Sequence, residues 1–217
     1  MPSAQALAAV APYRALLARP AEQVAADLES FCDLLAKWQR VQNLVSRETL
    51  GDVWTRHVVD SLQILPLLRP TDSVFLDLGS GGGFPALPLA IALKGRDCRF
   101  VLVEPNGRKA SFLRAVAREL GLSVNVEGRR SDQIDPRETG AVDVITSRAL
   151  APLPQLCGLM APFFGPKTRA ILHKGREHVE ELLESSAVWH HDVVVVASVT
   201  DPGGVLLELS NLSLKTS

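Results

Sequence analysis

Residues 74–85 read VFLDLGSGGGFP, an apolar segment that leads into a turn containing four glycines. The apolar part is Val74–Leu76, which Asp77 ends, and an apolar stretch of helical character, 86–93, follows the turn. A strand, a glycine turn and a helix in this order are typical of a nucleotide-binding crossover. Glycine lets the backbone bend sharply and approach a ligand closely. The stretch therefore predicts a ligand site at this turn, and the remaining chain must indicate which ligand.

Length and composition limit the class of protein. The chain has 217 residues, of which 47% are apolar and 22% charged, with a formal net charge of −1. This suits one globular domain with an additional piece. The net charge indicates no generally basic nucleic-acid binder, although a local basic patch is compatible with it.

Cysteine usage and hydropathy bear on the compartment. The three cysteines lie far apart and form neither a zinc pattern nor a disulfide framework, which favours a reducing compartment, the cytoplasm. The N-terminus has no basic start followed by an apolar run, so we expect no signal peptide. We also expect no membrane segment, because no apolar run reaches the ~20 residues that a membrane helix needs.

Helical patterns occupy most of the first 70 residues. Apolar residues recur at helical spacing over 22–41, a short helix is predicted over 48–54, and another over 55–68. Residues 1–21 have no clear pattern. We interpret residues 1–70 as an N-terminal helical cap and 71–217 as the main domain, the two forming one structural unit.

From residue 73 onward, short apolar strands alternate with helices. The predicted strands are 73–78, 98–104, 123–127, 142–147 and 168–173, and the predicted helices are 85–94, 107–120, 152–162 and 176–186. This alternation indicates a parallel sheet with helices on both faces.

The C-terminal part differs from this alternation. Two further strands, 190–199 and 205–213, are joined by a connection too short for a crossover, so they form an antiparallel hairpin. A doubly wound sheet closed by such a hairpin is the layout of class I methyltransferases that use S-adenosylmethionine. The predicted fold is therefore α/β, a Rossmann-like class I methyltransferase sheet with a terminal antiparallel hairpin and an N-terminal helical cap.

The glycine turn agrees with this layout. A dinucleotide fingerprint requires a third glycine where this chain has Phe84. The turn instead reads D-x-G-x-G-x-G, which resembles the S-adenosylmethionine loop. Asp77, Gly79, Gly81 and Phe84 are therefore predicted to bind this cofactor, although Phe84 is also suited to packing in the core.

Three polar residues after strand ends complete the predicted cofactor site. Glu104 closes the second strand, where a carboxylate accepts both ribose hydroxyls of the cofactor. This feature serves NAD equally well. Ser131 and Asp132 follow the third strand, where they would flank the adenine ring. The alternatives are an ordinary strand-end carboxylate for Glu104 and a solvated loop acid for Asp132.

Short motifs in a fixed order carry a family resemblance. They are Asn43-Leu44-Val45-Ser46, Arg56-His57-Val58-Val59-Asp60-Ser61, the Gly79–Pro85 loop, Gly107-Arg108-Lys109, Arg130, Ser147-Arg148-Ala149 and His173-Lys174-Gly175. From about residue 27 to 213 the chain resembles the bacterial small-subunit ribosomal RNA methyltransferase G family, also called glucose-inhibited division protein B. The family usually has G-K-R at 107–109, and often proline and leucine in place of Gly82 and Phe84.

The resemblance implies methylation of N7 of a guanine in 16S ribosomal RNA, with S-adenosylmethionine as methyl donor and the small ribosomal subunit as partner. N7 carries an in-plane lone pair and loses no proton, so the reaction needs no general base. The protein then contributes alignment and electrostatics. We expect no metal and a monomer.

Local cations are expected to hold the RNA. The predicted RNA-binding residues are Arg108, Lys109, Arg130, Lys174 and Arg176. Arg148 follows the fourth strand and is predicted to touch the cofactor or the guanine phosphate; with Lys174 it is a predicted catalytic residue. His57 and Asp60 lie one helical turn apart, which favours a capping or helix–helix hydrogen bond, with a gating role as the alternative.

Three alternatives from other functional classes stay open at this point. One is an NAD(P)-dependent oxidoreductase on a Rossmann fold, against which Phe84 and the terminal hairpin argue. A second is a non-catalytic ribosome-binding module with a methyltransferase fold, against which the intact Asp77, Gly79 and Glu104 argue. A third is a methyltransferase acting on a small molecule, which the near-neutral charge permits.

Overall fold

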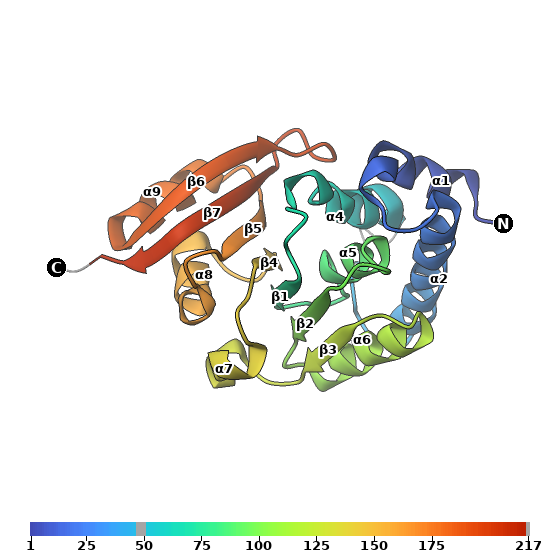
Figure 1. Ribbon diagram of the computed structural model, residues 1–217, viewed down its shortest axis with the longest axis horizontal. Helices are drawn as coiled ribbons and strands as arrows, with labels where there is room; N and C mark the ends of the chain where they lie inside the picture. The colour runs from blue at the N-terminus through green and yellow to red at the C-terminus, as the bar shows by residue number, and fades with distance from the viewer. Residues whose placement is uncertain (47–50, 216–217) are drawn as a thin grey trace.

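The computed structural model describes residues 1–46 and 51–215. Its centre is a seven-stranded sheet with the strand order β3-β2-β1-β4-β5-β7-β6 (Figure 1). The strands are β1 Val74–Leu78, β2 Arg99–Val103, β3 Val124–Glu127, β4 Val144–Arg148, β5 Arg169–Lys174, β6 Trp189–Ala197 and β7 Val205–Leu214. β1 to β5 are parallel, whereas β7 runs antiparallel to both β5 and β6. The predicted parallel sheet with a terminal hairpin is confirmed.

Helices cover both faces of the sheet. They are α1 Ala4–Val10, α2 Ala21–Gln39, α4 Asp60–Leu62, α5 Ala86–Ala92, α6 Gly107–Glu119, α7 Pro136–Thr139, α8 Leu153–Met160 and α9 His178–Val188. Side chains alternate across β1, so that Phe75 packs with α5 and α6 on one face, while Leu76 and Leu78 pack with α8 on the other.

The N-terminal helices share the core of the first face. α2 presents Leu28, Phe31 and Leu35, each fully buried, at the spacing that places them on one side of a helix. Burial of each side chain stabilises the fold by about 1.5–3 kcal/mol. The Phe31 ring lies 5.2 Å from that of Phe84, which follows the glycine turn. Figure 1 shows α1 and α2 beside α5 and α6, on the side of the molecule away from the hairpin.

Residues 1–21 are ordered, although their sequence has no clear pattern. They form α1 and a 3-10 helix, Ala11–Leu16, and bury Ala6, Val10 and Tyr13 in the core. α1 packs directly on α2. Small alanine side chains allow this close approach, and they also leave little periodicity of large apolar residues to recognise.

The segment before the sheet is less regular than predicted. The helix expected over 48–54 lies partly outside the described residues. In place of one helix over 55–68 there are a π-helix, Trp54–Val59, then α4, then a 3-10 turn, Leu65–Leu67. Pro66 lies in that turn and has no N–H with which to continue an α-helix.

Candidate active site

The glycine turn lies at the carboxyl end of β1 and is joined to β2. The backbone N–H groups of Gly79 and Ser80 both donate to the carbonyl of Val103, at 3.0 and 3.1 Å. Gly79 and Gly81 have φ angles of 73° and 53°, a region that L side chains rarely adopt. In an open α/β sheet this edge is where ligands bind.

Glu104 connects the turn to the next helix. Its two carboxylate oxygens accept hydrogen bonds from the backbone N–H groups of Gly81 and Asn106, each at 2.8 Å, and the residue is buried. Asn106 in turn caps α6, because its side chain accepts from Arg108 N and Lys109 N. Each carboxylate oxygen keeps further acceptor capacity for a ligand hydroxyl. The predicted ribose contact of Glu104 stays a prediction. The structure shows in addition that Glu104 holds the backbone of the glycine turn in place.

Asp77 is buried in β1 with one oxygen unsatisfied. The β1–β4 register places it opposite Thr146, whose hydroxyl donates to Oδ1 at 2.6 Å. Oδ2 has no hydrogen-bond partner among the described residues. Burial raises the pKa of Asp77 to about 7. A buried, unpaired carboxylate oxygen beside the glycine turn suits a cationic group of a ligand, such as the ammonium of S-adenosylmethionine.

Phe84 is packed between the cap and the turn. Its ring stacks on that of His57, with centroids 4.7 Å apart, and it is 7% exposed. These contacts favour the packing alternative for Phe84. Its predicted contact with the cofactor stays a prediction.

Ser131 and Asp132 lie where the sequence predicts them, directly after β3. They begin a 3-10 turn, Ser131–Gln133. The predicted RNA-binding residue Arg130 is ion-paired with Asp132 at 3.1 Å, and both side chains are more than half exposed. Because exposed ion pairs contribute little, either partner remains available to a ligand.

Arg148, at the end of β4, is held by two residues of the N-terminal cap. Its Nη2 donates to His57 Nδ1 at 2.7 Å, and its Nη1 lies 3.2 Å from Asp60 Oδ2. Burial and the neighbouring guanidinium lower the pKa of His57 to about 4, so its imidazole is neutral and able to accept. His57 and Asp60 thus both contact Arg148 at the end of β4, while Asp60 also pairs with Gln63 of its own segment. Their predicted capping or helix–helix role stays a prediction, as does the gating alternative.

Asp60 joins three parts of the chain. Besides Arg148, its carboxylate accepts from Thr200 Oγ1 at 2.6 Å, in the β6–β7 connection, and from Gln63 Nε2 at 2.8 Å. The backbone carbonyl of Asp60 accepts from His173 Nε2, at the end of β5, at 2.8 Å. Burial lowers the pKa of His173, which keeps this imidazole neutral as well.

Lys174 is already paired within the protein. Its ammonium donates to Glu181 of α9 at 2.6 Å and to the carbonyl of Ala151 at 2.9 Å, and its side chain is 8% exposed. Glu181 also accepts from the backbone N–H of Leu153 at 2.6 Å. The sequence indicated an available cation here, and it could not reveal the partner on α9.

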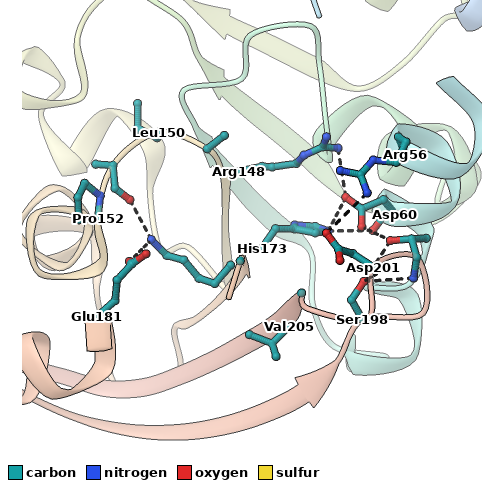
Figure 2. A pocket seen from close by; sticks show the side chains of 16 residues that line it. Arg56, Asp60, Arg148, Leu150, Pro152, His173, Glu181, Ser198, Asp201 and Val205 are labelled. Atoms are coloured by element: carbon teal, nitrogen blue, oxygen red, sulfur yellow. Dashed lines mark hydrogen bonds and ion pairs between the residues drawn. The ribbon is translucent and has the colours of Figure 1, made fainter. Parts of the chain in front are cut away.

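A cavity of about 430 Å³ opens between these two charge clusters at the ends of β4 and β5. Figure 2 shows Glu181 and Pro152 on one side of it and Asp60 and Ser198 on the other, with His173 between them. Arg56 and Asp201 also line it, and their side chains lie 3.6 Å apart. Arg176 is exposed, and its side chain lies against Gly203 of the hairpin connection.

The described residues form neither a metal site nor a membrane-spanning helix. Within residues 1–46 and 51–215, no group of three or more histidine, cysteine or acidic residues forms a metal site. In the same ranges, no helix has both the length and the apolar character needed to cross a membrane.

The sheet with its reversed seventh strand and the carboxylate-linked glycine turn define the class I S-adenosylmethionine-dependent methyltransferase fold. Solved structures with this fold are similar to the chain. A variant of MtNAS crystallised with S-adenosylmethionine has a TM-score of 0.58 and 16% identity, over 87% of this chain and 76% of that one. A SAM-dependent methyltransferase from Aquifex aeolicus has a TM-score of 0.54 and 16% identity, over 80% and 97%.

Sequence relatives identify the family. The family model described as rRNA small subunit methyltransferase G matches residues 24–205. Proteins named ribosomal RNA small subunit methyltransferase G are 42% identical over 188 residues in Cereibacter sphaeroides (86% of this chain, 90% of that one) and 41% identical over 202 residues in Rhizobium meliloti (91% and 94%). The chain therefore belongs to the rRNA small subunit methyltransferase G family, and the resemblance drawn from its motifs is confirmed.

Proposed function

We propose that this protein transfers the methyl group of S-adenosylmethionine to N7 of a guanine in 16S ribosomal RNA. The observation that carries the proposal is the position of the cavity in a member of this family. It opens at the ends of β4 and β5, at the same edge of the sheet as the glycine turn and Glu104. Family membership favours this reaction over nicotinamide-dependent oxidation and over a small-molecule substrate.

The cofactor fits the groups around the turn. Oδ2 of Asp77, which has no hydrogen-bond partner in the described part of the chain, is suited to its ammonium, and Glu104 has acceptor capacity for its ribose hydroxyls. Ser131 and Asp132 follow β3 on the side where the adenine would lie. When bound, the cofactor supplies a methyl group already activated by its sulfonium charge.

The chemistry of N7 matches the residues of the cavity. The N7 lone pair forms the new N–C bond as the S–C bond breaks, and the positive charge passes from sulfur to the guanine. No proton is removed, so no general base is needed. The lack of any need for a general base agrees with the state of His57 and His173. Both are largely buried and hydrogen-bonded, His57 to Arg148 and His173 to the carbonyl of Asp60. We assign Arg148 and Lys174 the alignment of the guanine nucleotide, as rigidly held cations.

The target guanine must leave any helix in which it is paired. N7 faces the major groove, which is deep and narrow in A-form RNA and closed to side chains. Enzymes that modify a base in this situation extrude it into a pocket. The cavity of about 430 Å³ has the size of an ordinary small-ligand site. The protein would act in the cytoplasm as a monomer on the small ribosomal subunit.

The test is transfer of labelled methyl groups. The protein is incubated with labelled S-adenosylmethionine and small ribosomal subunits, naked 16S RNA, or no RNA, and the labelled base is mapped. The proposal expects a single N7-methylated guanine in the RNA. Label only on the protein or on small molecules, or on a nitrogen other than N7, would refute it.

A further inference from the structure

A second, basic groove lies at the junction of the cap and α6. It has a volume of about 680 Å³ and is called the cap groove below. Its lining residues are Gln39, Arg40, Val41, Gln42, Asn43, Asn106, Arg108 and Lys109. Three of these are cations and none is acidic, in a chain whose formal net charge is −1. The positive charge is therefore local.

The cations of the cap groove differ from those of the cavity. Arg148, Lys174 and Arg56, which line the cavity, are all ion-paired. Among the described residues, Arg40, Arg108 and Lys109 form no salt bridge, and their side chains make no hydrogen bond. Like charges gathered without counter-charges repel one another, and an anionic ligand relieves that repulsion.

The backbone of the cap groove is held rigidly. Gln39 accepts from the N–H groups of Leu44 and Val45, at 2.8 and 3.1 Å, and donates to the carbonyl of Val45 at 2.9 Å. On the α6 side of the groove, the side chain of Asn106 caps the helix, and its backbone N–H donates to Glu104. A preformed surface binds a ligand without first having to be ordered.

The cap groove is extended and adjoins the cofactor turn. Lys109 also lines a neighbouring hollow of about 440 Å³ with Asn43–Ser46, and Gln39 and Arg40 line another of about 510 Å³. The carbonyl of Leu44 approaches Gly82 so closely that a Cβ there would lie 3.0 Å from it. A row of adjoining hollows with cations spaced along it suits an extended polyanion better than a compact phosphate ligand.

We propose that the cap groove binds the phosphodiester backbone of the RNA, with Arg40 and Lys109 each neutralising a phosphate. The inference rests on the proposed function for the identity of the polymer, and it gives the N-terminal cap a direct part in substrate binding. Neutral donors in the lining, such as the exposed side-chain amides of Asn43 and Asn106, are suited to phosphate oxygens.

The test measures binding of 16S RNA by filter retention over a range of salt concentrations, without methyl transfer. R40Q/K109Q removes two phosphate contacts, so the slope of log K against log salt should fall by about 1.4, and affinity at about 0.1 M salt by about 25-fold. R118Q is the matched control, because Arg118 is exposed in the last turn of α6, at the other end of the helix from Lys109. R40K/K109R, which keeps both charges, should retain the slope.

Cofactor affinity, measured by calorimetry, should be the same in all variants and shows that each one is folded. The inference is overturned if R40Q/K109Q and R118Q have the same slope, or if the wild-type protein does not retain RNA. The proposed function fails separately: wild-type protein that retains RNA but methylates no guanine would refute it, while the slopes would still decide on the cap groove.

Discussion

The unpaired oxygen of Asp77 leads to a prediction about pH. If the ionised carboxylate receives the cofactor's ammonium, binding requires the deprotonated form. With a pKa of about 7, the carboxyl group is half ionised at pH 7. At about pH 5.5 only about 3% is ionised, so affinity for S-adenosylmethionine should fall by about fifteenfold between these pH values.

Asp77→Asn tests whether this carboxylate is responsible. The asparagine carbonyl can still accept from Thr146, but the amide places a donor where Oδ2 stood. Loss of a charged hydrogen bond costs about 1.5–3 kcal/mol, so affinity at pH 7 should fall by about tenfold to a hundredfold. Below pH 7 the variant should show no pH dependence from this site.

Calorimetric titrations of both proteins with S-adenosylmethionine between about pH 5.5 and 7 give the comparison. In this range an α-amino group, with a usual pKa of about 7.7–8.0, stays protonated, so the ligand adds little slope of its own. A flat wild-type profile, or an equally steep profile in Asp77→Asn, would refute the assignment.

Stability should change in the opposite direction. The pKa of Asp77 is raised in the folded state from 3.8 to about 7, so the folded protein holds this proton more tightly than the unfolded chain. The resulting stability is fully present below about pH 3.8 and is lost as pH rises through about 7. Weaker cofactor binding at pH 5.5 would therefore accompany a favourable contribution of Asp77 to stability, so a loss of stability at Asp77 itself is not its cause.

Three further substitutions test other contacts. Glu104→Gln leaves one acceptor oxygen and turns an NH₂ group toward a backbone N–H of Gly81 or Asn106. Cofactor affinity measured by calorimetry should therefore fall by about tenfold to a hundredfold. Unchanged affinity would remove Glu104 from the site. Arg148→Ala should abolish methyl transfer to 16S RNA while the protein still folds, and full activity would contradict the role of Arg148. Arg169→Ala should lower the free energy of unfolding in urea by about 3–5 kcal/mol, because it leaves the buried Asp72 without its partner at 2.6 Å; a loss below about 1 kcal/mol would contradict this.

The fold could be predicted because its signals are local. The change from helical to strand periodicity near residue 73, the glycine turn and the short connection of the hairpin each depend on neighbouring residues. The same holds for Glu104, whose position at a strand end follows from the strand itself.

The partners of the site residues could not be predicted, because they come from distant parts of the chain. Asp77 meets Thr146 only through the β1–β4 register, and Lys174 meets Glu181 only because α9 packs back over the sheet. Residues 1–21 were also missed, since buried alanines such as Ala6 carry no strong periodic signal. Sequence patterns thus selected candidate site residues, while the question of which of them are paired within the protein required the structure.

The contacts of Arg148 link the cap to the end of the sheet. Two cap residues, His57 and Asp60, hold the guanidinium at the end of β4, and Asp60 also receives Thr200 from the hairpin. The position of Arg148 at the cavity therefore depends on segments from both ends of the chain. On the other side of the glycine turn, Gln39 fixes Leu44 against Gly82. An N-terminal extension that only covered the core would need neither set of polar contacts. We infer that the cap positions the groups that align the cofactor and the guanine, in addition to burying apolar surface.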